Sequence, residues 1–553
     1  MLFTILKTIA IIITVLVIFN LMIIVHELGH FLAARWRGLV IEKFGIWFGK
    51  PLWKKTINGV EYSLGSIPAG GFVALPQLAP MEVMEGKVET PREQLPPISA
   101  LDKIIVAFAG PLFSFGLACV FAVIVWQVGR PVGEAESSTV VGYVVEKSPA
   151  ADAGVQVGDE IIAVDGHSVK RFGGMGADSV MWRIIRSEGS TIDLSIVRDG
   201  QPLSLYPKAV IPEKSHWWNR KNLRQIGIAP FVSAVVAQVV PGTAAAAAGL
   251  QAGDIIAAVN GEKLRSGPEG IYEFAEKHPD APLTLTVQRN GADVALTFDP
   301  TGVSVVSVEK NSPAAAAGLK KGDTILAMDG KKVPVVASLI DYVGSRDGVP
   351  VTLLVRRAGQ ELEVQATPQV PLDTPDPAKR AKIGFVPEEG DGLMFQHMGK
   401  YKLIYPGPIE QLHAGMMSIF NTLDAIFSRK SSVSVQHMGG PVMMMNAYYN
   451  MLSNPEGLRM ALWFSVVLNV NLAMLNMLPI PVLDGGHITL ALIESIRRKP
   501  VNVRILEFVQ TGCALVIISF MVFIAFFDVQ DLPFFGDKRP QMKFRPPAGE
   551  VAK

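Results

Sequence analysis

Four long apolar stretches divide the chain. They cover residues 2–25, where Lys7 is the only charge, 104–128, 460–483 and, with a helix that begins near Ile505, 505–527. A transmembrane helix needs about 20 apolar residues, so each stretch is long enough to span a bilayer. The first stretch has no small-residue cleavage site and runs directly into polar sequence, so we expect a retained helix and not a signal peptide. The pattern therefore predicts four transmembrane helices.

The composition is typical of a membrane protein. Apolar residues make up 49% of the 553 residues, and the mean hydropathy is +0.32. The net charge of +1 gives no sign of a nucleic-acid partner. Both cysteines, Cys119 and Cys513, fall within predicted spans, so we expect no disulfide framework.

Lysine and arginine are concentrated in two of the connections between spans. Basic residues near the ends of spans mark the cytoplasmic side. We therefore expect both of these loops to be cytoplasmic, and both termini and residues 129–459 to be extracytoplasmic, although Arg130 and Arg459 are minor signals for the opposite orientation. The basic residues are Arg35, Arg37, Lys43, Lys50, Lys54, Lys55 and Lys103 in the first connection, and Arg497, Arg498, Lys499 and Arg504 in the second.

The long extracytoplasmic segment contains one pattern three times. "SPAADAGVQVGDEIIAVDGHSV" begins at Ser148, "GTAAAAAGLQAGDIIAAVNGEKL" at Gly242 and "SPAAAAGLKKGDTILAMDGKKV" at Ser312. Each copy predicts a helical turn of small residues, a Gly-Asp turn, an apolar strand and an Asp-Gly or Asn-Gly turn. A helical patch and a strand that ends in Arg-x-Gly follow each copy. Because the Gly-Asp pairs lie 95 and 69 residues apart, the copies are whole small domains and not solenoid repeats.

The three copies resemble the PDZ domains of bacterial proteases, a fold that binds extended peptides by adding a strand to a sheet edge. Any single copy fits equally well as a spacer or size filter. The Pro-rich residues 368–382 are typical of a linker. Residues 407–453 carry methionine and aromatic residues at helical spacings. This spacing indicates either amphipathic helices at the membrane surface or ordinary helix packing.

Two histidines and a glutamate interrupt the end of the first apolar stretch, in "NLMIIVHELGHFLAARWRG". Ionisable side chains within a membrane are costly and therefore indicate function. His26 and His30 are four positions apart, so they lie on one face of a helix and both imidazoles can reach one ion. His-Glu-x-x-His is typical of zinc proteases, in which the glutamate, here Glu27, takes a proton from water. The alternative is that local hydrogen bonds satisfy the histidines.

A catalytic zinc with two imidazole ligands needs a third protein ligand. Asp484, in "NVNLAMLNMLPIPVLDGGH", is the acidic residue among the apolar residues of the third span. Pro479 and Pro481 break the helix just before it and let it turn inward, where protein can satisfy the irregular backbone. A helix N-cap is the competing role for Asp484, and His487 is a competing ligand.

These motifs resemble the site-2 protease family of intramembrane zinc metalloproteases. The resemblance rests on His26-Glu27-x-x-His30, on Asn476-x-x-Pro479-x-Pro481-x-Leu483-Asp484-Gly485 and on the PDZ-like copies between them, and it covers essentially the whole chain. It implies three zinc ligands, a general base and two residues that bind the substrate backbone. These are His26, His30 and Asp484 as ligands, Glu27 as the base, and Asn471 and Asn476 as the backbone-binding residues.

The resemblance also identifies residues 58–73 as the family's membrane-reentrant β element, and its Asn-Gly is a hairpin signal in its own right. Asn469 matches no such family position and is interpreted as packing. Two features depart from the family pattern. The third PDZ-like copy exceeds the two of the enteric members, and Ser114 stands where the family often has asparagine, so we assign it no role.

We therefore expect a polytopic α-helical membrane protein with four transmembrane helices, a membrane-associated β-hairpin element and three tandem extracytoplasmic PDZ-like domains of mixed α/β structure. The expected segments are 1–38 (helix 1 with the histidines), 39–103 (cytoplasmic-side β element and loop), 104–128 (helix 2), 137–210, 230–299 and 301–368 (the PDZ-like domains), 369–459 (linker and amphipathic helices), 460–496 (helix 3 with Asp484), 505–527 (helix 4) and 528–553 (tail).

The resemblance implies a zinc endopeptidase of the bacterial inner membrane with its active site toward the cytoplasm. Its substrates are then transmembrane segments of single-span proteins, such as anti-sigma factors already clipped by an upstream site-1-type protease, and remnant signal peptides. Zn²⁺ and the lipid bilayer are the other implied partners, and no nucleic acid is expected. Two alternatives fit the sequence less well. A membrane scaffold without catalysis would have no need of Glu27. A metal transporter would need further intramembrane carboxylates along an ion path, and the sequence does not supply such a path.

Overall fold

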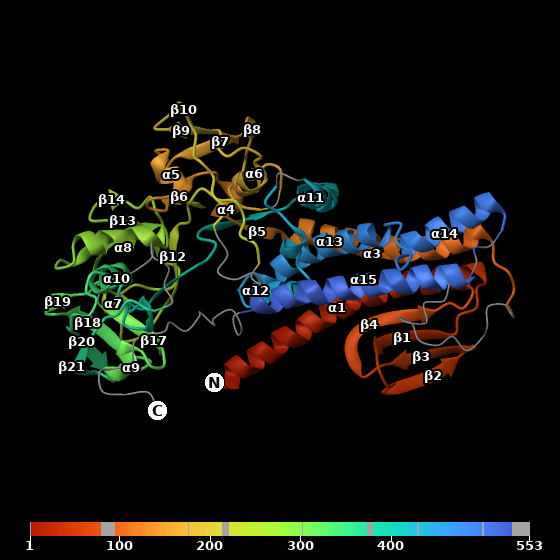
Figure 1. Ribbon diagram of the computed structural model, residues 1–553, viewed down its shortest axis with the longest axis horizontal. Helices are drawn as coiled ribbons and strands as arrows, with labels where there is room; N and C mark the ends of the chain where they lie inside the picture. Colours follow the sequence, from red (N-terminus) through yellow and green to blue (C-terminus); the bar gives the residue numbers. More distant parts are fainter. Residues whose placement is uncertain are drawn as a thin grey trace. The chain divides into compact units, whose positions relative to one another are not determined.

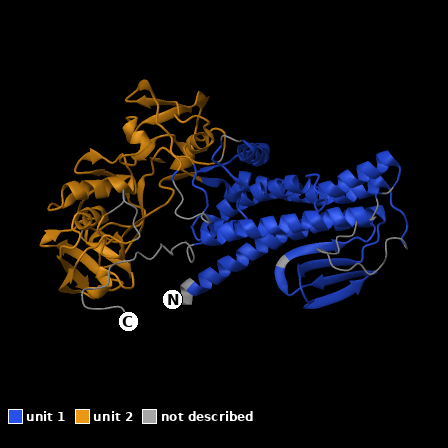
Figure 2. Cartoon of the chain, viewed as in Figure 1, with its two compact units in different colours: residues 1–131, 212–223, 403–536 blue, residues 132–211, 224–402, 537–553 orange. Residues whose placement is uncertain are grey.

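The computed structural model describes residues 2–78, 95–174, 176–212, 220–300, 302–372, 380–428, 431–499, 501 and 503–532. The chain forms two compact units (Figure 2). Unit 1 comprises residues 1–131, 212–223 and 403–536, and unit 2 comprises residues 132–211, 224–402 and 537–553. Each unit has its own hydrophobic core, and each is described separately.

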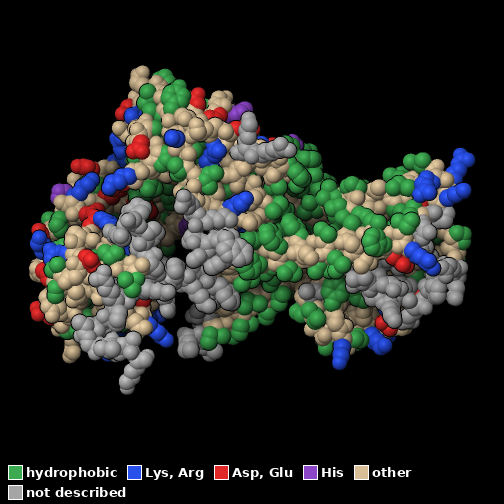
Figure 3. All heavy atoms as spheres, viewed as in Figure 1, with side chains coloured by type: hydrophobic (Ala, Val, Ile, Leu, Met, Phe, Trp, Pro, Cys, Tyr) green, Lys and Arg blue, Asp and Glu red, His purple; other side chains and the backbone are tan. Residues whose placement is uncertain are grey.

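Unit 1 is built on four long apolar helices, α1 (Leu2–Arg37), α3 (Ala100–Val128), α13 (Gly457–Asn476) and α15 (Val503–Gln530). Each is long and apolar enough to cross a membrane, which confirms the four predicted spans. Figure 1 shows them running alongside one another. Hydrophobic side chains cover much of their outer face, and lysine and arginine gather beyond the end of α14 (Asp484–Arg497) (Figure 3). A lipid-facing surface has this composition.

The segment between α1 and α3 folds as a four-stranded sheet, in the order β2-β3-β1-β4. Asn58 and Gly59 both have positive φ angles, of 52° and 82°, and join β2 to β3 as the predicted hairpin turn. The element is larger than the expected hairpin, because β1 pairs with both β3 and β4. The edge strand next to α1 is therefore β4 and not the hairpin. The strands are β1 (Lys43–Phe48), β2 (Trp53–Ile57), β3 (Val60–Leu64) and β4 (Ile67–Ala74).

The third span is not one continuous helix to its end. It breaks after α13, and α14 begins again at Asp484, as the two prolines predict. Two further helices, α11 (Pro408–Phe427) and α12 (Pro441–Leu452), join the membrane helices in unit 1. The Gln411 amide of α11 donates to the Ala122 carbonyl of α3 at 2.9 Å, while Phe427 of the same helix is 81% exposed. α11 therefore packs on α3 through one face and leaves apolar side chains uncovered elsewhere.

Unit 2 contains three modules of similar structure, numbered in chain order. Module 1 consists of β6 (Val141–Val144), α5 (Pro149–Asp152), β7 (Glu160–Val164), β8 (His167–Ser168), α6 (Val180–Arg186), β9 (Leu194–Arg198), β10 (Gln201–Leu205) and β11 (Ile228–Pro230). Module 2 consists of β12 (Ala234–Val239), α7 (Ala244–Ala247), β13 (Ile255–Val259), β14 (Glu262–Lys263), α8 (Pro268–Lys277), β15 (Leu283–Arg289), β16 (Ala292–Phe298) and β23 (Leu393–Phe395). Module 3 consists of β17 (Val303–Val308), α9 (Pro313–Ala316), β18 (Thr324–Met328), β19 (Lys331–Lys332), α10 (Val336–Gly344), β20 (Val351–Arg357), β21 (Gln360–Ala366) and β22 (Phe385–Glu389).

The described residues also form short elements outside the modules: β5 (Arg130–Gly133) pairs with β24 (Tyr401–Ile404), α4 (Glu134–Ser137) follows β5, and a 3₁₀ turn covers Val435–His437.

Each module is closed by a strand that lies beyond its expected end. β11 pairs with β6 in module 1, β23 with β12 in module 2, and β22 with β17 in module 3. Since β23 follows all of module 3 in the sequence, module 3 is inserted into module 2, and the two are nested and not tandem. The expected linker leads into β22, with Gln369 bridged to Lys382. Residues 373–379 of that linker lie outside the described residues.

The Gly-Asp and Arg-x-Gly signals of the repeat meet in space. In module 1, Arg198 donates two hydrogen bonds of 2.7 Å to the buried Asp159 and one, also of 2.7 Å, to the Gly154 carbonyl. Such bidentate, charge-assisted contacts fix geometry as well as adding energy. The same three contacts recur between Arg289, Asp254 and Gly249 in module 2 and between Arg357, Asp323 and Gly318 in module 3.

We expect the stability of unit 2 to depend on pH through Glu389. Burial raises the pKa of this carboxyl from its ordinary 4.5 to about 7, so the folded state holds the proton more tightly than the unfolded state. Stability is then greatest below pH 4.5, falls as the pH rises toward 7 and is constant above. Amide hydrogen exchange of β22 in the full chain measures this slope, and Glu389→Gln should remove most of it. An unchanged slope in the variant would assign it to another group.

Candidate metal centre

The end of α1 carries His26 and His30 one turn apart on a face that packs against α3. Glycines make this close approach possible. A Cβ at Gly29 would lie 2.4 Å from the Ala109 carbonyl oxygen of α3, and a Cβ at Gly110 would lie 2.2 Å from the His30 ring. Both distances are shorter than real contacts, so the small residues of α1 and α3 create the space that the two imidazoles occupy.

Each imidazole is held through its Nδ1 atom, which leaves Nε2 directed elsewhere. His30 Nδ1 lies 2.8 Å from the Val106 carbonyl oxygen, to which it can only donate. His26 Nδ1 lies 3.0 Å from the Ser114 hydroxyl, and Ser114 is fully buried. A hydrogen bond from one ring nitrogen to a carbonyl fixes the tautomer in which the other nitrogen has a free lone pair, as metal-binding histidines require. Ser114, to which the sequence assigned no role, is thus a partner of His26.

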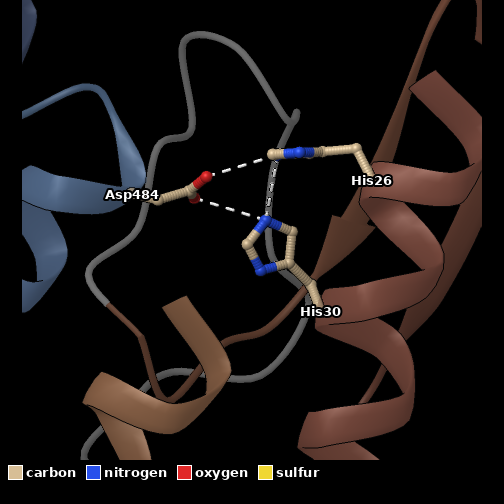
Figure 4. A group of neighbouring side chains, drawn as sticks. All are labelled: His26, His30 and Asp484. Carbon is tan, nitrogen blue, oxygen red and sulfur yellow. Dashed lines mark hydrogen bonds and ion pairs between the residues drawn. The ribbon is translucent and has the colours of Figure 1, made fainter. Parts of the chain in front are cut away.

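Asp484 reaches this face from the break between α13 and α14. It is the first residue of α14, and two glycines follow it. A Cβ at Gly485 would lie 2.2 Å from the Met477 carbonyl oxygen, and one at Gly486 would lie 2.1 Å from that of Ile480. The Gly-Gly pair therefore lets the start of α14 fold back onto the loop, which directs the Asp484 carboxylate toward the histidines (Figure 4).

The three side chains bring their possible ligand atoms close together, with one carboxylate oxygen of Asp484 near each histidine. His26 Nε2 lies 3.3 Å from His30 Nε2 and 3.2 Å from Asp484 Oδ2, and His30 Nε2 lies 3.3 Å from Asp484 Oδ1. Tetrahedral zinc with bonds of 2.0–2.2 Å separates its ligand atoms by about 3.3 Å. This donor set, two imidazoles and one carboxylate, therefore fits the size and the chemistry of a zinc ion and leaves one coordination position open.

Glu27 lies beside this group and next to β4. Its carboxylate accepts a hydrogen bond from the Val73 backbone N–H. A Cβ at Gly71 would lie 3.4 Å from its Cγ, so the strand backbone passes close to the glutamate. Glu27, the two histidines and Asp484 line one cavity of about 180 Å³ together with apolar residues of β4, α3 and the loop before α14.

The other candidate residues differ in position. Asn476 lines the cavity, and its amide lies 3.4 Å from His26 Nε2. Asn471 is not among the described residues that line the cavity, and its side-chain oxygen is buried without a hydrogen-bond partner. His487 also lines the cavity. It is outside the group whose ligand atoms lie within 4.8 Å of one another among the described residues.

Two features of the site are missing from the sequence interpretation. Ser114 departs from a family pattern, but it is also a polar residue in an otherwise apolar span, and such a residue needs a partner. The position of β4 beside Glu27 depends on strand pairing between distant residues, which apolar patterning does not encode.

Comparisons with known proteins find relatives that cover most of the chain. The sequence profile of Peptidase family M50 matches residues 14–520. A putative zinc metalloprotease of Neisseria meningitidis is 26% identical over 92% of this chain and 97% of its own length. Protease RseP of Yersinia pestis is 27% identical (89% and 92%), and regulator of sigma-E protease RseP of Escherichia coli K12 is 26% identical (94% and 98%). A solved PDZ domain of an SdrC-like protein from Listeria monocytogenes matches at 27% identity, over 17% of this chain and 93% of that domain, with a TM-score of 0.15. From the match over most of its length, the chain belongs to Peptidase family M50 and is a zinc metalloprotease of the site-2 type.

Proposed function

We propose that this protein is an intramembrane endopeptidase that cleaves transmembrane segments of single-span proteins. One observation carries the proposal. His26, His30 and Asp484 form a zinc-sized ligand group beside Glu27, on helices long enough to span a bilayer. A carboxylate next to an open metal position is the arrangement of a metallohydrolase. We assign the first three residues as ligands and Glu27 as the general base.

Zinc bound here supplies Lewis-acid polarisation of the scissile carbonyl and lowers the pKa of a water. Glu27 accepts the proton of the attacking water and delivers it to the leaving amine. Asn476, at the cavity wall, offers an amide that both donates to and accepts from substrate backbone. Asn471 is assigned the same role by resemblance alone, since its side-chain oxygen is buried away from the cavity.

The names of the relatives suggest the class of substrate. Several carry the name regulator of sigma-E protease. From this name and the family resemblance, we infer that this chain cuts anti-sigma-factor-like membrane proteins that another protease has already clipped outside the membrane, and also remnant signal peptides. The test compares membrane peptide fragments in cells that carry the wild-type or the Glu27→Gln protein. Transmembrane remnants should accumulate in the variant, and identical fragment sets would contradict the proposal.

We propose an inner-membrane location with unit 2 and both termini extracytoplasmic and the metal group toward the cytoplasm. Its support is the cluster of basic residues after α1 and α14. With Cys119 and Cys513 replaced, a cysteine at Ser190 or Gly330 should react with an impermeant thiol reagent in intact cells. A cysteine at Gly38 should not react until the cells are opened. The reverse labelling pattern would overturn the orientation.

We propose that the substrate is held as an extended strand beside β4. A peptide carbonyl within a helix is hydrogen-bonded and shielded, so the helix must open, and each freed backbone group in lipid needs a new partner. β4 lies at the sheet edge, and the Val73 N–H points to Glu27 and not to β1. By the two-residue alternation of a strand, the Gly71 N–H points the same way.

Gly71→Pro removes this N–H at an edge position that tolerates proline. We expect it to slow cleavage of Leu-rich transmembrane substrates by about tenfold, the value of one lost hydrogen bond. Substrates with Gly or Pro near the scissile bond, whose helices open more easily, should be less affected. Gly71→Ala keeps the N–H and serves as the control. Equal rates for the two variants on both substrates would contradict strand addition.

A further inference from the structure

The three modules of unit 2 can be aligned from their hydrogen bonds. At the segment that enters the closing strand, one backbone carbonyl accepts from the small-residue turn in every module, and the next residue is always glycine. The carbonyls belong to Ile226, Asp391 and Ile383. The three glycines, Gly227, Gly392 and Gly384, in turn accept from the neighbouring strand, which fixes the same register in all three modules.

One aligned position differs in chemistry. Ile226 and Ile383 are 1% and 3% exposed, and each belongs to the hydrophobic core of its module. Asp391 replaces them in module 2 and is equally buried, at 2%. Its Oδ1 accepts the Leu393 N–H at 2.8 Å, and the Tyr272 hydroxyl of α8 interacts with the same carboxylate. A carboxylate is costly at a core position, so its presence there indicates a specific purpose.

The Leu393 N–H is the group that an added strand needs. Leu393 lies opposite Val239 in a pair whose flanking hydrogen bond comes from Val240 to the Gly392 carbonyl, so the Leu393 N–H points away from the sheet. β23 is the last strand of its sheet. Ile228 and Phe385 hold the same positions on the terminal strands β11 and β22. The residues aligned with Asp391, Ile226 and Ile383, have no side-chain acceptor for these N–H groups.

Residues next to α10 and β22 of module 3 also cover the edge of module 2 at which a peptide would bind. Val335, just before α10, is 1% exposed and belongs to the hydrophobic core of module 2, together with residues of α8 and β12. Glu389, the last residue of β22, accepts the next N–H, that of Val336, at 3.1 Å. The segment that joins the two modules therefore places an apolar side chain and a carboxylate of this chain where a peptide and its terminal carboxylate would lie.

The charged residues just before the aligned glycine also differ between module 2 and the other two modules. Arg224 precedes Gly227 by three residues in module 1, and the exposed Arg380 and Lys382 precede Gly384 in module 3. Glu388 and Glu389 precede Gly392 in module 2. The residues just before the glycine are therefore basic in modules 1 and 3 and acidic in module 2, although Arg380 also pairs with Asp341 and the two glutamates also end β22 of module 3.

We propose that module 2 is closed to peptide by Asp391 and Val335, so that among the three modules only modules 1 and 3 keep the open strand edge, on β11 and β22, at which PDZ-like domains take the free carboxyl terminus of an extended peptide. The backbone N–H groups of Ile228 and Phe385 receive the carboxylate, and the added strand pairs with the sheet edge. This rests on the proposed function only in that a substrate clipped outside the membrane presents such a terminus. Module 2 then serves to hold module 3, and not to recognise substrate.

The test is photo-crosslinking to the full chain in detergent. The probe is a ten-residue apolar peptide that ends in a free valine carboxylate and carries a benzophenone, and the control is its C-terminal amide. Crosslinks should map to α6–β11 and α10–β22, and the amide should lower their yield about tenfold or more, since hydrogen bonds to a charged group are worth that much. Crosslinks on α8–β23, or equal yields for the amide, would overturn the proposal.

Two variants separate the contributions. Lys382→Glu, at an exposed site, should weaken the module 3 crosslink up to about fivefold, as expected for a surface charge, and leave the module 1 crosslink unchanged. Asp391→Ile combined with Val335→Ala should create crosslinks on α8–β23, and their absence in a folded variant would contradict closure by these residues. No cleavage is required, so the Glu27→Gln chain gives the same map even if the proposed proteolysis is wrong.

Discussion

Replacing Glu27 by glutamine is expected to lower the rate of peptide-bond cleavage by about 10²- to 10⁴-fold, the usual contribution of a general base. Glutamine has nearly the same volume and can still bond to the Val73 backbone, but it cannot accept the proton of the attacking water. Because Glu27 is outside the group formed by the two histidines and Asp484, the variant should keep its zinc. Cleavage of a reconstituted transmembrane substrate and zinc per chain are the two measurements.

The matched control is Glu410→Gln, which makes the same chemical change at an exposed position in the first turn of α11. It should cleave at the wild-type rate. If Glu27→Gln retains more than about a tenth of wild-type turnover with zinc bound, another group is the base. If it loses zinc as well as activity, Glu27 stabilises the metal group directly, and its assigned role is wrong.

The parts of the fold that could be predicted from the sequence are those written in local patterns. Span length predicts α1, α3, α13 and α15, because the bilayer thickness sets a minimum length of apolar helix. The spacing of His26 and His30 places both on one helix face. The Asn58-Gly59 turn follows from two residues that tolerate positive φ.

The unpredicted parts depend on pairing between residues far apart in the chain. β11 and β23 have three residues each, which is too short for a periodic signal. Each pairs with the first strand of its module, β6 or β12, and a long segment of chain separates the two partners. The nesting of module 3 in module 2 is therefore invisible in a repeat that aligns only the first part of each module. β4 likewise gains its position beside Glu27 from pairing with β1.

The polar residues of the site also fall into two groups, those that local sequence indicates and those whose role depends on distant contacts. His26, His30 and Asp484 were found because ionisable groups in apolar sequence need an explanation. Ser114 and Val106 support the rings through contacts across 88 and 76 residues, and a local pattern does not show which side chains such distant residues contact. Asp391 lies between two glycines, a sequence typical of a turn, and only its alignment with two buried isoleucines distinguishes it.

Replacing Asp484 by asparagine is expected to reduce zinc affinity by more than about 100-fold and to abolish cleavage. Loss of an outer partner of a metal ligand costs about 10- to 100-fold in affinity, and loss of the ligand itself should cost more. A neutral amide oxygen is a poorer zinc ligand than a carboxylate, and two imidazoles alone leave the ion with half of its tetrahedral positions filled by protein. Zinc per chain after dialysis against a chelator series measures the affinity.

Two further variants make the result specific to the carboxylate. Ser114→Ala removes the hydroxyl that holds His26 at 3.0 Å and should weaken zinc by the smaller, 10- to 100-fold factor. His487→Asn alters another polar residue of the same cavity and should leave zinc unchanged, because the ring is not needed to complete the three-ligand group. The opposite order, zinc retained in Asp484→Asn and lost in His487→Asn, would make His487 the third ligand. Asp484 would then act only at the start of α14, where a carboxylate interacts favourably with the helix dipole.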